Sequence, residues 1–128
     1  MQKIRTGFIA VGLLGLAASV AWAGDLAGSW RGKGTISLAS GAREQATCRA
    51  EYRRRANEGY VVRAICATPS GRAEQTAALQ RVSANTYRGT FYNREYGISG
   101  TIYVRISGNT HTARLTSEAG SASLRFRR

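Results

Sequence analysis

The stretch Ile98-Ser99-Gly100-Thr101-Ile102-Tyr103-Val104-Arg105-Ile106-Ser107, followed by Gly108-Asn109, decides the fold class. Its aliphatic residues recur at every second position, which is the period of a strand with one buried face. A Gly-Asn pair between two such runs is typical of a two-residue β-hairpin turn. The stretch therefore predicts a strand over 98–107 that turns directly into a second strand over 110–117.

The same alternation extends along the rest of the chain and is broken at short intervals by turn residues. We predict eight strands, over residues 28–38, 43–53, 60–67, 73–82, 86–93, 98–107, 110–117 and 121–127. Short links favour antiparallel neighbours, and an eight-stranded meander can close so that it leaves no exposed edge. The predicted fold is all-β, a small antiparallel eight-stranded up-and-down barrel, with a two-sheet β-sandwich as the alternative.

The first residues have the features of an export signal. Lys3 and Arg5 precede an apolar run over 7–20, and Ala21-Trp22-Ala23 places small residues just before Gly24. This order is typical of a signal peptide, and the run is too short and too rich in Gly and Ala for a membrane span. We predict a signal peptide over 1–23 and one domain over 24–128, periplasmic or secreted from a bacterium, with no transmembrane segment after cleavage. The alternative is an uncleaved anchor.

The chain contains two cysteines, Cys48 and Cys66. A hairpin centred on Asn57 places them opposite each other on the inward face of two neighbouring strands. An exported compartment is oxidising, so we predict that they form a disulfide. There is no Cys-x-x-Cys motif, and a single histidine cannot complete a zinc site with two cysteines. We therefore expect neither a metal nor a cofactor.

The predicted domain is strongly basic. Without Lys3 and Arg5, the Lys and Arg total falls from 19 to 17 while Asp and Glu remain at 7, so residues 24–128 carry a formal charge of +10. Nearly all of it is arginine, which forms bidentate contacts with carboxylate and phosphate groups. An anionic partner is therefore one expectation, and a protein that is merely highly charged is the other. Export argues against nucleic acid as the natural partner.

The arginines gather most densely in the predicted hairpin loop and on its flanking strands. The candidate anion-binding residues are Arg49, Arg53, Arg54, Arg55 and Arg63. The alternative is a solvated loop that nearby glutamates partly neutralise.

Catalytic residues are scarce. The predicted domain has one aspartate, Asp25, at its expected N-terminus and one histidine, His111, far along the chain. The glutamates fall at turns or outward positions, so no carboxylate pair is supported. No nucleophile elbow or glycine-rich phosphate loop is present. We therefore predict a protein that is not an enzyme and has no catalytic residues.

The segment Leu26-Ala27-Gly28-Ser29-Trp30, at the start of the first strand, resembles the Gly-x-Trp opening of calycin barrels. These are the lipocalin, avidin and bacterial metalloprotease-inhibitor families. The resemblance implies that Trp30 packs across a closed barrel end against a basic residue of the last strand, here Arg125 or Arg127. An ordinary core tryptophan is the alternative. Avidin-like proteins hold a small ligand in the barrel, whereas in the inhibitors the chain before the first strand enters a protease cleft.

Three functions remain open from the sequence. The first is an exported, non-enzymatic binding protein that contacts an anionic envelope component or a small ligand. The second is a periplasmic inhibitor of a protease, which implies a protein partner. The third is a structural envelope protein whose barrel is filled by its own side chains.

Overall fold

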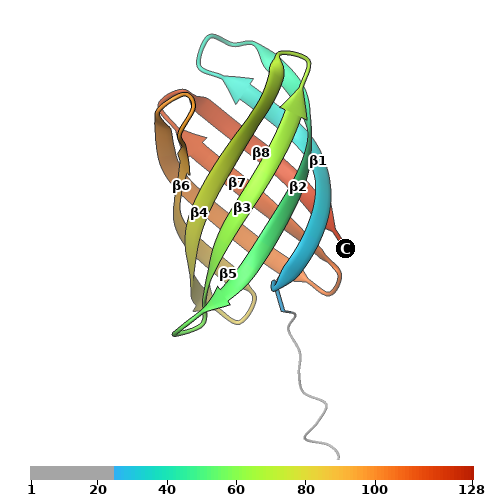
Figure 1. Ribbon diagram of the computed structural model, residues 1–128, viewed down its shortest axis with the longest axis vertical. Helices are drawn as coiled ribbons and strands as arrows, with labels where there is room; N and C mark the ends of the chain where they lie inside the picture. The colour runs from blue at the N-terminus through green and yellow to red at the C-terminus, as the bar shows by residue number, and fades with distance from the viewer. Residues whose placement is uncertain (1–24) are drawn as a thin grey trace, which may run out of the picture.

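The computed structural model describes residues 25–128, so the predicted signal peptide and Gly24 lie outside the described residues. The elements are β1 Gly28–Leu38, β2 Arg43–Arg55, β3 Gly59–Thr68, β4 Gly71–Ser83, β5 Thr86–Asn93, β6 Ile98–Ser107, β7 Thr110–Ser117 and β8 Gly120–Arg127. Each strand pairs with the next, and β8 pairs with β1 to close the barrel (Figure 1). The eight-stranded antiparallel barrel is confirmed, and the sandwich alternative is wrong.

The predicted strand bounds differ from the structure mainly around the first arginine-rich turn. β2 continues to Arg55, two residues beyond the prediction, and β3 already begins at Gly59. The chain reverses over 56–58 because Asn57 and Glu58 both adopt a φ of 59°. Asparagine tolerates this left-handed conformation better than most residues. Arg54 and Arg55, which were predicted to lie in the hairpin loop, are therefore the last residues of β2.

Two hairpins, β6–β7 and β2–β3, show how local sequence sets the pairing of neighbouring strands. Ser107 pairs with Thr110, so Gly108-Asn109 is a two-residue turn, as predicted, and Gly108 supplies its φ of 60°. In the β2–β3 hairpin, Cys48 lies directly opposite Cys66 and forms the predicted disulfide. The register and the covalent link are therefore consistent with each other.

The described chain contains no helix that is long and apolar enough to cross a membrane.

Inward glycines allow close approach between neighbouring strands. A Cβ atom on Gly34 would lie 1.9 Å from the Ser123 carbonyl oxygen, and one on Gly89 would lie 1.7 Å from that of Ala78. These distances are far below van der Waals contact, so only glycine fits there without movement of the backbone. Glycine at both positions therefore permits the close approach of the neighbouring backbone.

The barrel interior is filled unevenly along its length. We call the end where β1 begins and β8 ends the closed end, and the opposite end, where β1 ends and β8 begins, the open end; in Figure 1 they are the lower and upper ends. Large buried rings occupy the closed half: Trp30, Tyr52, Tyr60, Tyr87, His111 and Phe126. Toward the open end several inward positions carry alanine, including Ala73 and Ala122. The sequence thus fills one half of the barrel and leaves space in the other.

Candidate functional site

Residues 25–27, just before β1, cover the closed end. The Leu26 side chain is fully buried in the core. The indole Nε1 of Trp30 donates to the Leu26 carbonyl at 2.8 Å, and the Leu26 N–H donates to the Tyr60 hydroxyl oxygen at 3.3 Å. In the protease-inhibitor family that the sequence resembles, the segment before the first strand enters a protease cleft. In this structure Leu26 of that segment packs into the protein's own barrel.

Asp25 anchors the same segment from outside. The Tyr60 hydroxyl donates to Asp25 Oδ1 at 2.7 Å, the Ala27 N–H donates to the same oxygen at 3.0 Å, and Arg54 forms an ion pair with Oδ2. Burial alone would raise the pKa of the Asp25 carboxyl, but these hydrogen bonds and the Arg54 charge outweigh it and lower the pKa. Burial, together with Asp25, raises the pKa of Tyr60.

The basic residue beside Trp30 is Arg128, and not Arg125 or Arg127. Its guanidinium lies 4.2 Å from the centre of the Trp30 ring, and it donates to the carbonyls of Asp25 at 2.6 Å and Ala27 at 2.8 Å. Strand alternation explains the difference, because Phe126 points inward and its two neighbours must point outward. Arg128 comes two residues after Phe126, at the next inward position, and its side chain lies over the end of the barrel.

A buried polar pair lies beneath this cap. The Tyr52 hydroxyl is 2.9 Å from Nε2 of His111, whose ring stacks on Phe126 at 4.8 Å between centroids. Nδ1 of His111 is buried and has no hydrogen-bond partner among the described residues. Burial, helped by the Arg128 charge, lowers the pKa of His111 to about 3, so the ring is neutral near pH 7. The His111 side chain is thus a neutral ring enclosed in the core.

The open end contains a cavity of about 400 Å³. The inward ends of several strands line it, and its surface is mainly apolar. The apolar lining includes Ile36, Cys66, Phe91, Ile98, Leu115 and Ala122. Tyr96 is 63% exposed in the β5–β6 turn and stands at the mouth. The disulfide is therefore part of the cavity wall as well as a crosslink.

Two side-chain amides bring polarity into this apolar space. Gln75 lines the cavity from β4, and Asn93 is buried at the end of β5. Asn93 Oδ1 accepts a hydrogen bond from the Tyr96 N–H at 3.1 Å, which leaves its NH₂ group for another partner. At the rim, Glu44 accepts a hydrogen bond from Ser70, and this contact lowers the pKa of the Glu44 carboxyl. The cavity thus offers amide donors and acceptors but no buried charge.

Sequence reasoning identified neither amide. The alternation of β4 places Gln75 between inward Ala73 and Ala77, and Asn93 lies two residues after inward Phe91. The alternation of inward and outward residues in the sequence already places both amides on the inward face. A polar residue at an inward position is therefore the signal that could have identified them.

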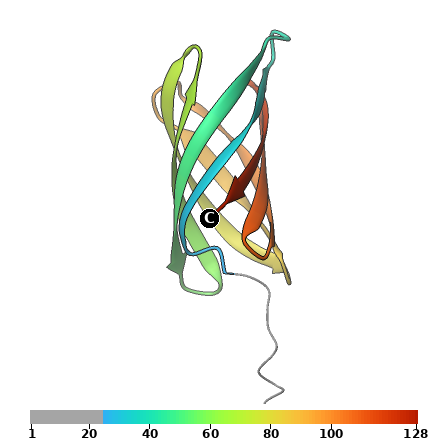
Figure 2. The same ribbon diagram turned by 90° about the vertical axis from the view of Figure 1, so that its right-hand side faces the viewer.

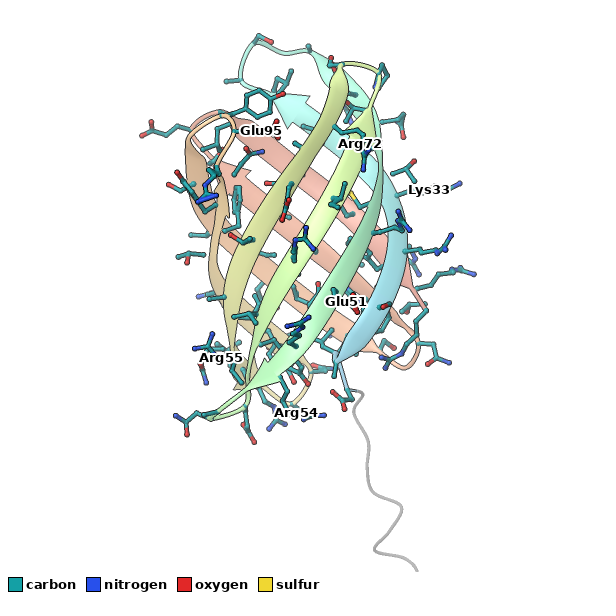
Figure 3. All side chains as sticks on the ribbon, viewed as in Figure 1. Lys33, Glu51, Arg54, Arg55, Arg72 and Glu95 are labelled. Carbon is teal, nitrogen blue, oxygen red and sulfur yellow. A yellow bond between two sulfur atoms is a disulfide. The ribbon has the colours of Figure 1, made fainter. Side chains whose placement is uncertain are left out.

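The candidate anion-binding arginines do not all lie together, because Arg49, Arg53 and Arg63 lie around Glu51 on the outer wall while Arg54 turns to the closed end. Arg54 points to Asp25 across the closed end, and Arg63 forms an ion pair with Glu74 on the outer wall. Arg53 and Arg55 are exposed at the end of β2, while Arg49 lies farther along that strand. Figure 3 shows Arg54 and Arg55 near the closed end, far from Arg72 and Glu95 at the open end. Two of the five charges are thus already neutralised within the molecule.

No protein-family model and no curated protein matches the chain. Several solved structures that it resembles are designed β-barrels. The redesigned barrel mFAP1, bound to DFHBI, aligns with a TM-score of 0.68 at 12% identity over 80% of this chain and 94% of that chain. A de novo designed fluorescence-activating barrel aligns with a TM-score of 0.62 at 17% identity over 80% of this chain and 93% of that chain. At these identities the likeness shows the fold, a small calycin-like closed barrel.

Proposed function

We propose that residues 24–128 form an exported, non-enzymatic binding protein that holds a small, largely apolar ligand in the open-end cavity. The observation that carries this proposal is the cavity itself, whose volume of about 400 Å³ lies within the range usual for small-molecule sites. The closed end supports it, because its packed rings and the Leu26 plug leave one route of entry.

The lining indicates what kind of ligand fits. Phe91 and Tyr96 offer aromatic faces against which a flat ring can pack. The amides of Gln75 and Asn93 would pair with one or two polar groups, since a buried polar group without a partner is costly. A mainly apolar molecule with a few neutral polar atoms matches this arrangement. The redesigned barrel mFAP1, which has a similar fold, is bound to DFHBI, and this supports the proposal.

The proposal that the protein is not an enzyme draws on where its acid–base groups lie. His111 is shut beneath the closed end, away from the cavity, and its pKa is about 3. Glu44 is at the rim and already accepts the Ser70 hydroxyl. The Glu44–Ser70 pair lies in the exposed turn region at the rim, and the buried polar side chains of the cavity, Gln75 and Asn93, are amides suited to binding.

Export is part of the proposal and depends on residues 1–23. We expect the protein from a bacterial envelope fraction to begin at Gly24, which N-terminal sequencing would show. A chain that retains Met1 in the membrane fraction would contradict it and favour the uncleaved anchor.

Native mass spectrometry of protein purified gently from its own envelope tests the cavity. We expect a discrete extra mass on the wild type and its loss in Ala122→Phe, which places a ring inside the cavity. Ser123→Phe is the matched control, because it adds the same ring one residue away on the outer face. A bare wild-type mass, or an extra mass retained in Ala122→Phe, would contradict the proposal.

Contact with an anionic component of the envelope is a second candidate function. It is favoured by the formal charge of +10 on residues 24–128 and by the exposed arginines on the barrel wall. Export again argues against nucleic acid as the partner in the cell. Binding that weakens steeply with salt is its expected signature.

A further inference from the structure

Five cations gather on the outer face of β8, β1 and β2. Arg31 of β1 lies directly between Arg127 of β8 and Arg49 of β2 in the strand register, and Lys33 lies opposite Arg125. All five side chains are exposed. We call Arg31, Lys33, Arg49, Arg125 and Arg127 the basic face. Figure 2 shows its three strands side by side at the front of the barrel, and Figure 3 shows Lys33 pointing away from the wall.

The molecule does not neutralise this face internally. The three ion pairs within residues 25–128 use Asp25, Glu58 and Glu74, and none includes a residue of the basic face. Glu51, the outward carboxylate two residues from Arg49, accepts a hydrogen bond from Ser29. Like charges directly opposite each other destabilise a sheet. These opposed cations lower the stability of the sheet, and no acidic side chain of the described residues pairs with them. We therefore infer that an anion from outside the protein binds them.

The surroundings of the basic face restrict the partner's chemistry. Most of its register neighbours are hydroxyl residues, such as Thr47 beside Lys33 and Thr112 beside Arg125, while half-buried Ile65 lies beside Arg49. The exposed large hydrophobic side chains of the described chain are Leu38, Val82, Tyr92 and Tyr96, all outside this face. Half-buried Ile65 offers little apolar surface to enter a bilayer, and none of the exposed aromatic side chains of the described residues lies on this face for a base to stack on. Hydroxyls among arginines suit a partner that carries both hydroxyl and anionic groups.

The shape of the wall adds a further restriction. A barrel wall is convex, so a flat membrane meets it along a line, whereas a flexible polymer can follow it. Neighbouring strands lie about 5 Å apart and same-face residues about 7 Å apart along a strand, so the cations form a two-row grid. A linear chain laid across the strands passes Arg127, Arg31 and Arg49 in succession.

We propose that the basic face binds a linear anionic polysaccharide, with its arginines on sulfate or carboxylate groups and the flanking threonines on sugar hydroxyls. This inference rests on the second candidate function, anion contact, and is independent of the cavity.

The test is the affinity of the mature protein for a fluorescent heparin octasaccharide and for a polygalacturonate fragment at low salt. The variant Arg31→Gln/Arg49→Gln/Arg127→Gln removes the central row. The matched control Arg53→Gln/Arg55→Gln/Arg88→Gln removes the same net charge from exposed positions elsewhere. We expect the row variant to bind at least about tenfold more weakly, with a shallower salt dependence, and the control to lose less than about threefold.

The possible outcomes distinguish failure of the basic face as the binding site from failure of anion contact as a function. Equal losses in both variants would overturn the basic face while leaving anion contact in place. Failure of the wild type to bind any polyanion would overturn both. Tighter binding to an oligothymidylate or to anionic phospholipid vesicles, lost in the row variant, would overturn the polysaccharide as partner. Thermal unfolding of each variant confirms that the barrel is intact.

Discussion

The hydroxyl of Tyr52 and Nε2 of His111 are 2.9 Å apart and join β2 to β7 across the barrel interior. Trp30 packs edge-on against the His111 ring at 4.3 Å between centroids, and Phe126 stacks on it. With Nδ1 of His111 lacking a partner, the ring can make only one of its two hydrogen bonds within the described protein. The closed end is thus held by a neutral histidine, which makes it sensitive to acid.

Acid is expected to destabilise the barrel through His111. Its pKa is near 6.5 in the unfolded chain and about 3 in the folded protein, so the unfolded state binds the extra proton between these values. The stabilisation is complete above pH 6.5 and is lost as the pH falls toward 3. At pH 4.5 we expect the free energy of unfolding to be about 2–3 kcal/mol lower than at pH 7.5 from this residue alone. Urea denaturation at both pH values measures it.

The double variant Tyr52→Phe/His111→Phe is the control for that effect. It removes both polar groups and keeps two rings of similar size, so no partner is left unpaired. We expect its unfolding free energy to fall less than that of the wild type over the same pH interval. Parallel pH curves for the two proteins would show that His111 does not titrate in this way.

The hydroxyl of Tyr60 is expected to hold the closed-end cap. It donates to Asp25 Oδ1 and accepts from the Leu26 N–H, so Tyr60→Phe removes two contacts to the segment before β1. We expect a loss of about 1–2 kcal/mol in unfolding free energy at pH 7. The loss should shrink in acid as Asp25 becomes protonated, because its lowered pKa means that its stabilisation is present only above that value.

Tyr87→Phe is the matched comparison, because the Tyr87 ring packs against Tyr60 at 5.4 Å between centroids but makes no hydrogen bond to Asp25 or Leu26. We expect it to cost less than about 0.5 kcal/mol. If both tyrosine variants lost the same stability, the cap would owe little to the Tyr60 hydroxyl.

The Cys48–Cys66 disulfide is expected to stabilise the barrel by about 3 kcal/mol, from the loop of 18 residues that it closes. Melting with and without reductant measures this, and the Cys48→Ala/Cys66→Ala variant should melt like the reduced wild type. Reductant should leave the double variant unchanged. A wild type whose melting point does not fall on reduction would contradict the prediction.

The sequence was sufficient for the barrel because each local signal agrees with the global fold. The alternation of 98–107 fixed both the strand and its inward face, and the Cys48–Cys66 pairing fixed the register of one hairpin. Because the turns are short, each strand pairs with the strands next to it in the sequence. Where these signals coincide, pattern reasoning predicts topology well.

The site was harder to predict, since it depends on volumes and end contacts that alternation does not encode. The cavity exists because alanines such as Ala73 and Ala122 face one end while aromatic rings fill the other. Arg128 was not predicted beside Trp30, although it has the same inward parity as Phe126, because the basic residue was sought within the predicted strand that ends at Arg127. The basic face required the register, since Arg31, Arg49 and Arg127 are far apart in sequence and adjacent only across strands.

The charge repulsion on the basic face can be measured in the free protein, without a ligand. Arg31 has an arginine opposite it on each side, so Arg31→Thr is expected to raise the unfolding free energy by a few tenths of a kcal/mol. Arg105→Thr is the control, because Arg105 lies between Thr86 and Thr112 and has no like charge opposite it. Salt screens exposed charges, so the gain in unfolding free energy from Arg31→Thr should fade between low salt and about 0.5 M salt while that of the control stays constant.

If both variants behaved alike at every salt concentration, the arginines of the basic face would not repel one another measurably. The basic face would then carry no stability cost for an anionic partner to relieve.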